Sequence, residues 1–163
     1  MHIRPFEYQD EEHVVAMMRE HPLQFPTFII EKYPLRWLTF LDSLEQMNAV
    51  NTNSCYYVVI GDDRILGHAG YLFNHEVGLY EIVGVAVNKE HQRLGIGRQL
   101  IHTLCDRLKD MGSNKVILYT LGHTDNESTI IFYRNLGFEI INYEYDFFTT
   151  DYHRVTFIKK LVR

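Results

Sequence analysis

Residues 91–112 read HQRLGIGRQLIHTLCDRLKDMG, and this stretch turns from a loop into a helix. Gly95 and Gly97 stand one residue apart, and apolar residues follow them at helical spacing. The first N–H groups of a helix have no partner within the helix and carry partial positive charge. Because glycine lets a ligand come close to the backbone, the stretch predicts a phosphate-binding site, to which Arg93 and Arg98 would add ionic contacts.

A loop that merely needs two glycines, with its arginines in water, is the competing interpretation. The dinucleotide-binding pattern G-x-G-x-x-G fails here, because Leu100 stands at the position of its last glycine. The phosphate-loop pattern also fails, because no Gly-Lys-Ser/Thr triplet follows. The stretch is therefore expected to be an anion-binding loop of another kind.

The patterns on either side of this stretch predict an α+β fold. Three β-branched and aromatic runs joined by short turns precede it, which indicates an antiparallel meander. A continuous apolar run follows it, as in a strand buried on both faces. The expected strands are 2–6, 55–61, 65–73, 79–87, 115–120, 138–148 and 154–161, and the expected helices are 11–21 (capped by Asp10), 34–47, 96–111 and 125–136. We expect a single domain, 1–163, with a mixed, mostly antiparallel sheet of about seven strands and four helices.

Composition limits the kind of protein. The chain has 163 residues, of which 46 % are apolar and 23 % charged, as in an ordinary globular domain. A net charge of −5 offers no large basic field, which argues against a nucleic-acid partner. No apolar run approaches membrane-spanning length and the start lacks a secretory pattern, so we expect a cytoplasmic protein without a membrane partner.

The cysteines and histidines give no sign of a metal site. Cys55 falls in an expected strand and Cys105 in an expected helix, and both are interpreted as buried free thiols. The histidines include no H-x-x-x-H pair with a carboxylate motif, so no metal is proposed.

Two motifs together resemble the Gcn5-related N-acetyltransferase (GNAT) family. Residues 92–97, QRLGIG, match its pyrophosphate-binding pattern, Arg/Gln-x-x-Gly-x-Gly/Ala. Residues 132–138, FYRNLGF, resemble its second signature, an aromatic-Tyr helix end that runs into Gly-Phe. Asn126 stands seven residues before Tyr133, as the family often has it. The order of elements is similar as well, most weakly over residues 20–50.

The resemblance implies acetyl-coenzyme A (acetyl-CoA) as co-substrate. Backbone amides of the glycine loop would hold its pyrophosphate, and the pantetheine arm would lie along strand 79–87 like an added strand. In this family that strand splays from the next one, 115–120, and Gly84 would ease a bulge that opens the slot. The cofactor contacts expected on this basis are Val85, Ala86, Val87, Gln92, Arg93, Leu94, Gly95, Ile96, Gly97, Arg98, Asn126 and Tyr133.

The implied reaction is direct attack of an amine on the thioester in a ternary complex. The amine must lose a proton, and Glu81 is the candidate base because it stands in an otherwise apolar strand. Its surroundings, EIVGVAV, also resemble the strand that carries the base in the histone-acetylating branch of the family. Tyr133 is the candidate acid for the leaving thiolate. A solvent-facing or arginine-paired Glu81 and a core Tyr133 are the structural alternatives.

Three other residues have weaker claims. His123 is an alternative base, although a loop histidine more often faces water. His68 stands two residues from Gly70 in its strand and could face the cleft. Asn126 suits a contact with the pantetheine amides and an ordinary helix start equally well.

The acceptor side is expected to involve residues 21–37 and 146–153, which are rich in aromatic side chains. Rings favour a flat or apolar acceptor, or a cation, and Asp146, Asp151 and Glu31 could attract an amine. Core packing and a partner contact, such as a homodimer, explain the same aromatics equally well. The expected acceptor is a primary amine of a small molecule or peptide, and a catalytically silent domain that binds or senses acyl-CoA is the alternative function.

Overall fold

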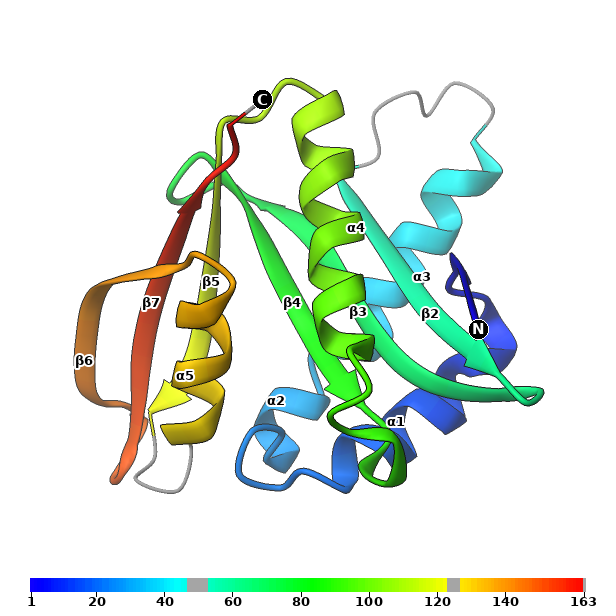
Figure 1. Ribbon diagram of the computed structural model, residues 1–163, viewed down its shortest axis with the longest axis horizontal. Coiled ribbons are helices and arrows are strands. Elements are labelled where there is room, and N and C mark those ends of the chain that lie inside the picture. The colour runs from blue at the N-terminus through cyan, green and yellow to red at the C-terminus, as the bar shows by residue number, and fades with distance from the viewer. Residues whose placement is uncertain (47–52, 123–126, 163) are drawn as a thin grey trace.

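A computed structural model of the protein describes residues 1–46, 53–122 and 127–162 (Figure 1). The strands are β1 (His2–Pro5), β2 (Ser54–Gly61), β3 (Arg64–Asn74), β4 (Leu79–Val87), β5 (Lys115–Gly122), β6 (Glu139–Thr149) and β7 (Tyr152–Lys160). The α-helices are α1 (Glu11–Arg19), α2 (Thr27–Ile30), α3 (Tyr33–Glu45), α4 (Ile96–Asp110) and α5 (Glu127–Asn135), and two short 3₁₀ helices are η1 (Tyr8–Asp10) and η2 (Lys89–His91).

All seven strands form one sheet, in the order β1-β2-β3-β4-β5-β7-β6. Only the β4–β5 pair is parallel, and the other neighbours in the sheet are antiparallel. The predicted mixed, mostly antiparallel sheet is therefore confirmed. Helix α4 lies in front of β3 and β4 in Figure 1, with α3 on the far side of the sheet.

The helix predicted from the glycine loop is the one that packs most closely on the sheet. Its apolar stripe is fully buried against β3 and β4, and consists of Ile96, Leu100, Ile101, Leu104 and Leu108. Burying a side chain of this kind contributes about 1.5–3 kcal/mol, so this face anchors the start of α4 firmly. The two cysteines are free and buried, as expected.

The sheet opens between β4 and β5. These strands pair only from Tyr80 to Ile82, opposite 116–118, and then part (Figure 1). Opposite β3, the pairing moves from His68–Ala86 to Gly70–Val83, so β4 contains one residue more than its partner. Gly84 lies in this bulge with a φ of +68°, which other residues rarely adopt. The predicted splay and bulge are confirmed.

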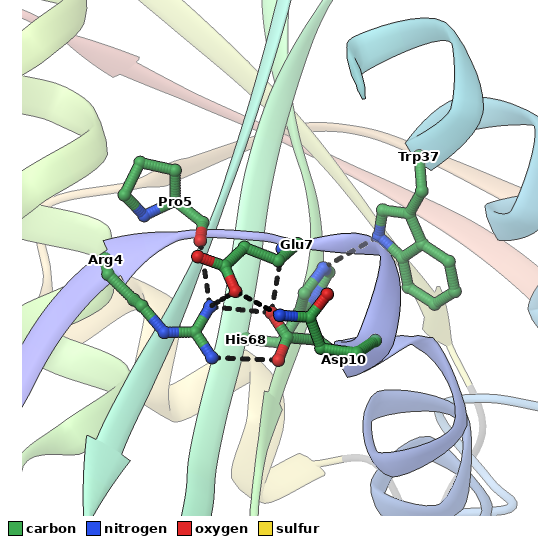
Figure 2. Close-up of polar contacts among 7 residues, drawn as sticks. Arg4, Pro5, Glu7, Asp10, Trp37 and His68 are labelled. Carbon is green, nitrogen blue, oxygen red and sulfur yellow. Dashed lines mark hydrogen bonds and ion pairs between the residues drawn. The ribbon is translucent and has the colours of Figure 1, made fainter. Parts of the chain in front are cut away.

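Two expectations near the N-terminus are wrong. Asp10 does not cap α1, because its carboxylate accepts from the Glu7 N–H at 2.8 Å and pairs with Arg4 at 2.7 Å (Figure 2). The segment before Tyr33, for which no helix is expected, contains the single turn α2. None of the helices that the structure describes has the length and apolar character needed to cross a membrane.

Candidate functional site

A cleft of about 240 Å³ begins where β4 and β5 part. Residues 83–85 of β4 form one wall, and residues 118–121 of β5 form the opposite wall. Because β4 pairs with β5 only up to Ile82, the backbone of 83–85 presents groups on this side that β5 does not satisfy. A ligand with its own amides could pair with such an edge as an added strand.

His68 and Trp37 support the bulge in β4 from the core side of the sheet. His68 is completely buried, and its Nδ1 lies 2.7 Å from the Gly84 carbonyl oxygen. Its Nε2 lies 3.0 Å from the Trp37 indole nitrogen (Figure 2). The carbonyl can only accept and the indole N–H can only donate, so the imidazole is neutral with its proton on Nδ1. Burial lowers the pKa of His68 to about 4. The expectation that His68 could face the cleft is wrong, since its ring lies in the core.

Glu81 lines the cleft one residue before the last position at which β4 and β5 still pair. Its Oε1 accepts a hydrogen bond from the Asn74 side-chain nitrogen at 3.1 Å. Burial raises the pKa of the Glu81 carboxyl, and the nearby positive charges of Arg36, Lys32 and Arg154 oppose this rise. A half-buried carboxylate with a raised pKa is suited to taking up a proton.

Tyr133 lines the same cleft from α5. It is 5 % exposed, and its ring packs against Phe132, Phe138 and Phe157 with centroid separations of 5.1 to 5.7 Å. Burial raises the pKa of its hydroxyl, so the phenol keeps its proton at neutral pH. Tyr133 is thus both a core residue and a cleft residue.

The glycine loop ends at Gly95, which precedes α4 with a φ of +81° and provides no side-chain cap. The first hydrogen bond of the helix runs from the Gln99 N–H to the Gly95 carbonyl at 2.9 Å. The N–H groups of residues 96–98 therefore have no partner in the helix. A Cβ at Gly97 would lie 3.2 Å from the Phe132 ring, so α5 comes close to this first turn. The free N–H groups could therefore hold an anion, and a small residue at position 97 keeps the space in front of α5 open.

The predicted cofactor contacts on β4 and in the glycine loop succeed one another along the chain from the cleft to this helix start. Val85 lines the cleft, Ala86 is buried, and the Val87 carbonyl lies 2.7 Å from the His21 Nε2, which donates to it. Residues 92–95 and Arg98 are exposed, whereas Ile96 and Gly97 are buried in the first turn. Asn126 and His123 lie outside the described residues.

The charges on the acceptor side differ from those expected. Glu31, Asp146 and Asp151 are not among the residues that line the cleft, and Asp146 instead accepts from the Asp151 N–H at 2.8 Å. The charged side chains that join Glu81 in lining it are basic: Lys32, Arg36 and Arg154. Sequence reasoning missed these residues, because nothing local to them signals that they meet.

Aromatic side chains close the acceptor end of the cleft. The lining rings of this end belong to Phe25, Tyr33, Phe147 and Phe148, along with Tyr119 of β5. The Phe28 ring of α2 packs against those of Phe148 and Tyr152, with centroid separations of 5.7 Å and 5.9 Å. The β6–β7 hairpin therefore packs against α2. Trp37, in contrast, is 1 % exposed and belongs to the core.

Comparisons with known proteins agree with this geometry. Residues 8–138 match the model of a family described as "Acetyltransferase (GNAT) family". Human N-acetyltransferase 8 is 30 % identical over 90 residues, which are 53 % of this chain and 39 % of the human protein. The chain spans 24 % to 39 % of the length of the curated relatives it matches.

Solved structures share the fold across the whole chain. A GNAT-family structure from Desulfovibrio desulfuricans has a TM-score of 0.80 and 19 % identity, with 99 % of each chain covered. An aminoglycoside 6'-N-acetyltransferase complexed with coenzyme A has a TM-score of 0.74 and 16 % identity, with 100 % of this chain and 98 % of the other covered. At these identities the likeness shows the fold alone.

Proposed function

The chain belongs to the GNAT family of acetyltransferases, and we propose on that premise that it transfers the acetyl group of acetyl-CoA to a primary amine by direct attack in a ternary complex. One observation carries the proposal. The uncapped start of α4 follows β4 in the chain, and the part of β4 that does not pair with β5 lines a cleft together with Glu81 and Tyr133. We infer as well that residues 1–163 form one domain, because strands from both ends share the sheet.

The donor would be held by backbone groups along β4 and α4. The N–H groups of residues 96–98 would bind the diphosphate, with Arg93 and Arg98 adding charge, and the loop residues 92–95 would surround it. The unpaired backbone of Val85, continuing toward Ala86 and Val87, would bind the pantetheine amides. The coenzyme A-bound relative of the same fold supports this assignment.

The two candidate catalytic side chains suit opposite halves of the reaction. Glu81 would take the proton that the amine loses, directly or through one water, and its raised pKa brings it closer to the working range of a general base. Tyr133, which stays protonated, would donate a hydrogen bond to the leaving thiolate. A backbone N–H in the splayed part of β4 would polarise the thioester carbonyl.

Gly97→Asp should weaken coenzyme A binding at least about tenfold, because a carboxylate would face the diphosphate and displace a backbone contact. The new side chain would also press on Phe132, which lies 3.2 Å from the Cβ position. Calorimetry with coenzyme A measures the effect, and Gly97→Ala separates crowding from charge. Wild-type affinity in the aspartate variant would contradict the loop assignment.

Tyr133→Phe should lower kcat roughly tenfold or more, since a hydrogen bond to the developing thiolate is lost. The Kd for coenzyme A should change little, because the ring keeps its packing against Phe138 and Phe157. Tyr145→Phe is the matched control, as Tyr145 is 76 % exposed on β6. Unchanged turnover in Tyr133→Phe would remove this residue as the acid.

The function itself is tested by free-thiol release from acetyl-CoA with a panel of primary amines. Acceptor-dependent release, with the acetylated amine identified by mass spectrometry, is the expected result. If coenzyme A binds tightly and no amine across a broad panel is acetylated, the chain is a silent acyl-CoA-binding domain and the proposed transfer is wrong.

A further inference from the structure

Three basic side chains, two from the start of α3 and one from β7, line the acceptor end of the cleft. Lys32 immediately precedes α3, Arg36 lies one turn into that helix, and Arg154 belongs to β7. Among the described residues that line the cleft, Glu81 is the sole acid. The lining side chains therefore carry three positive charges against one negative charge when Glu81 is ionised. Glu144, which pairs with Arg154 from outside the lining, reduces the excess to one positive charge.

Arg154 is held in place by three contacts. Its Nε donates to Glu144 at 2.8 Å, and its guanidinium lies 3.8 Å from the centroid of the Phe147 ring and 4.5 Å from that of Tyr119. Arginine stacks on aromatic faces in this way while its donors remain directed outward in the guanidinium plane. Because the Glu144 bond uses Nε, no described residue occupies the two terminal nitrogens, which can bind a planar anion.

Arg36 and Lys32 are less committed to acids of the protein. Arg36 lies 5.1 Å from the Tyr33 ring and Lys32 lies 5.9 Å from the Phe148 ring. Within the described part of the chain, neither forms an ion pair shorter than 4.0 Å. The charges of Arg36, Lys32 and Arg154 lower the Glu81 pKa through space, without a direct contact to its carboxylate. Two cations that face a partly enclosed cleft with rings beside them, and with no described acid within 4.0 Å, favour an anion there.

This basic group is separate from the cations expected to meet the donor's phosphates. Arg93 and Arg98 flank the start of α4, at the opposite end of the β4 path from Glu81. Pantetheine carries no charge, so the donor provides nothing for the basic group to neutralise. A simple alkylamine would arrive as an ammonium ion and would be repelled by the excess positive charge.

We propose that the acceptor is an amine that also bears an anionic group, a carboxylate or phosphonate close to the amine, and that Arg36, Arg154 and Lys32 bind this group. An α-amino acid is the simplest member of the class. Its anion balances the cleft, its amine is left near Glu81, and an apolar side chain can lie on Phe147 and Phe148. The inference rests on the proposed acetyl transfer.

The test uses α-amino acids that are each paired with the corresponding amide, for example phenylalanine and phenylalaninamide, in the thiol-release assay with acetyl-CoA. The carboxylate member should have a kcat/KM about 10- to 100-fold higher, as expected for a charge-assisted hydrogen bond. The amine of phenylalaninamide is less basic, so a larger fraction of it is unprotonated at neutral pH. The supply of free amine alone would therefore favour the amide. Equal or better use of the amides across the panel would overturn the proposal.

Arg36→Met should abolish most of this preference, because KM should rise much more for phenylalanine than for phenylalaninamide. A role limited to tuning Glu81 would change both acceptors equally, which would overturn the assignment of Arg36 to the anion. Arg19→Met is the control, since it removes the same charge from an exposed position at the end of α1. Arg36→Lys should restore part of the preference.

Two further experiments distinguish failure of this inference from failure of the proposed acetyl transfer. N-acetylphenylalanine should bind the coenzyme A complex more tightly than its amide by calorimetry, whether or not phenylalanine is a good substrate, and equal binding would overturn the proposal. Faster transfer from succinyl-CoA than from acetyl-CoA to neutral amines would assign the cations to the acyl group and overturn it as well. Absence of coenzyme A binding would defeat the proposed function, and this inference with it.

Discussion

Turnover by Glu81→Gln is expected to fall about 100- to 1000-fold at neutral pH, because the amide cannot accept the proton of the attacking amine. The side chain keeps its size and can still contact Asn74, so the cleft should keep its shape. Wild-type kcat should rise with pH through the Glu81 pKa, which burial places above its usual value of 4.5. The variant should lack this rise.

The same substitution should not reduce stability above that pKa. A carboxyl whose pKa is higher in the folded chain binds more protons there than in the unfolded chain, so its contribution to stability falls as pH rises from about 4.5 through the folded-state pKa. Glutamine does not ionise, so the variant does not lose this stability as pH rises. We therefore expect the free energy of unfolding of Glu81→Gln to equal or exceed that of the wild type at pH 8.

Glu139→Gln is the matched control, since Glu139 is exposed on β6. It should leave both kcat and the pH profile unchanged. Denaturant titrations at two pH values, together with steady-state rates, separate the two effects. Wild-type turnover in Glu81→Gln would remove Glu81 as the base, whereas a large loss of stability would show that the carboxylate supports the fold.

Gly84→Ala is expected to destabilise the protein by about 2–4 kcal/mol and to abolish most turnover. The backbone at Gly84 has a φ of +68°, which strains any residue with a Cβ. The added methyl group would also lie 2.8 Å from the Tyr33 ring and 2.9 Å from the His68 ring. Relief would require the bulge to flatten, and a flat β4 could pair further with β5 and narrow the cleft.

Gly78→Ala isolates the backbone part of this effect. Gly78 has a similar φ of +70°, in the turn before β4, but no atom lies within 4 Å of its Cβ position. It should lose only about 1–2 kcal/mol and keep its kcat. Thermal unfolding and thiol release measure both variants. If Gly84→Ala behaves like Gly78→Ala, the contacts beneath the bulge do not hold the slot open.

Much of the fold could be predicted from the sequence, because most of its elements are encoded by local patterns. The helical spacing after Gly97 and the unbroken apolar run at 116–118 both reflect burial against the sheet. The cap expected at Asp10 is wrong because an aspartate that caps a helix and one that pairs with arginine look alike in sequence, and Arg4 pairs with it only in the folded chain. The turn at α2 is too short for periodicity to reveal.

The site divides in the same way. The glycine loop and the acid in an apolar strand could be found because each is a short, continuous pattern. The basic group could not, since Arg36 and Arg154 are more than a hundred residues apart and meet only because β7 and α3 flank the same opening. Asp146 lies within the expected acceptor segment, but its carboxylate accepts from the Asp151 N–H and lies 3.7 Å from His153.

The bonds beneath the bulge give this molecule a built-in optical reporter. Trp37 is the sole tryptophan of the 163 residues, so selective excitation addresses one known ring. That ring stacks on Phe6 at 4.8 Å and is joined through one imidazole to the carbonyl of Gly84. Intrinsic fluorescence of the unlabelled protein can therefore follow, in real time, any rearrangement that accompanies ligand entry between the two separating strands.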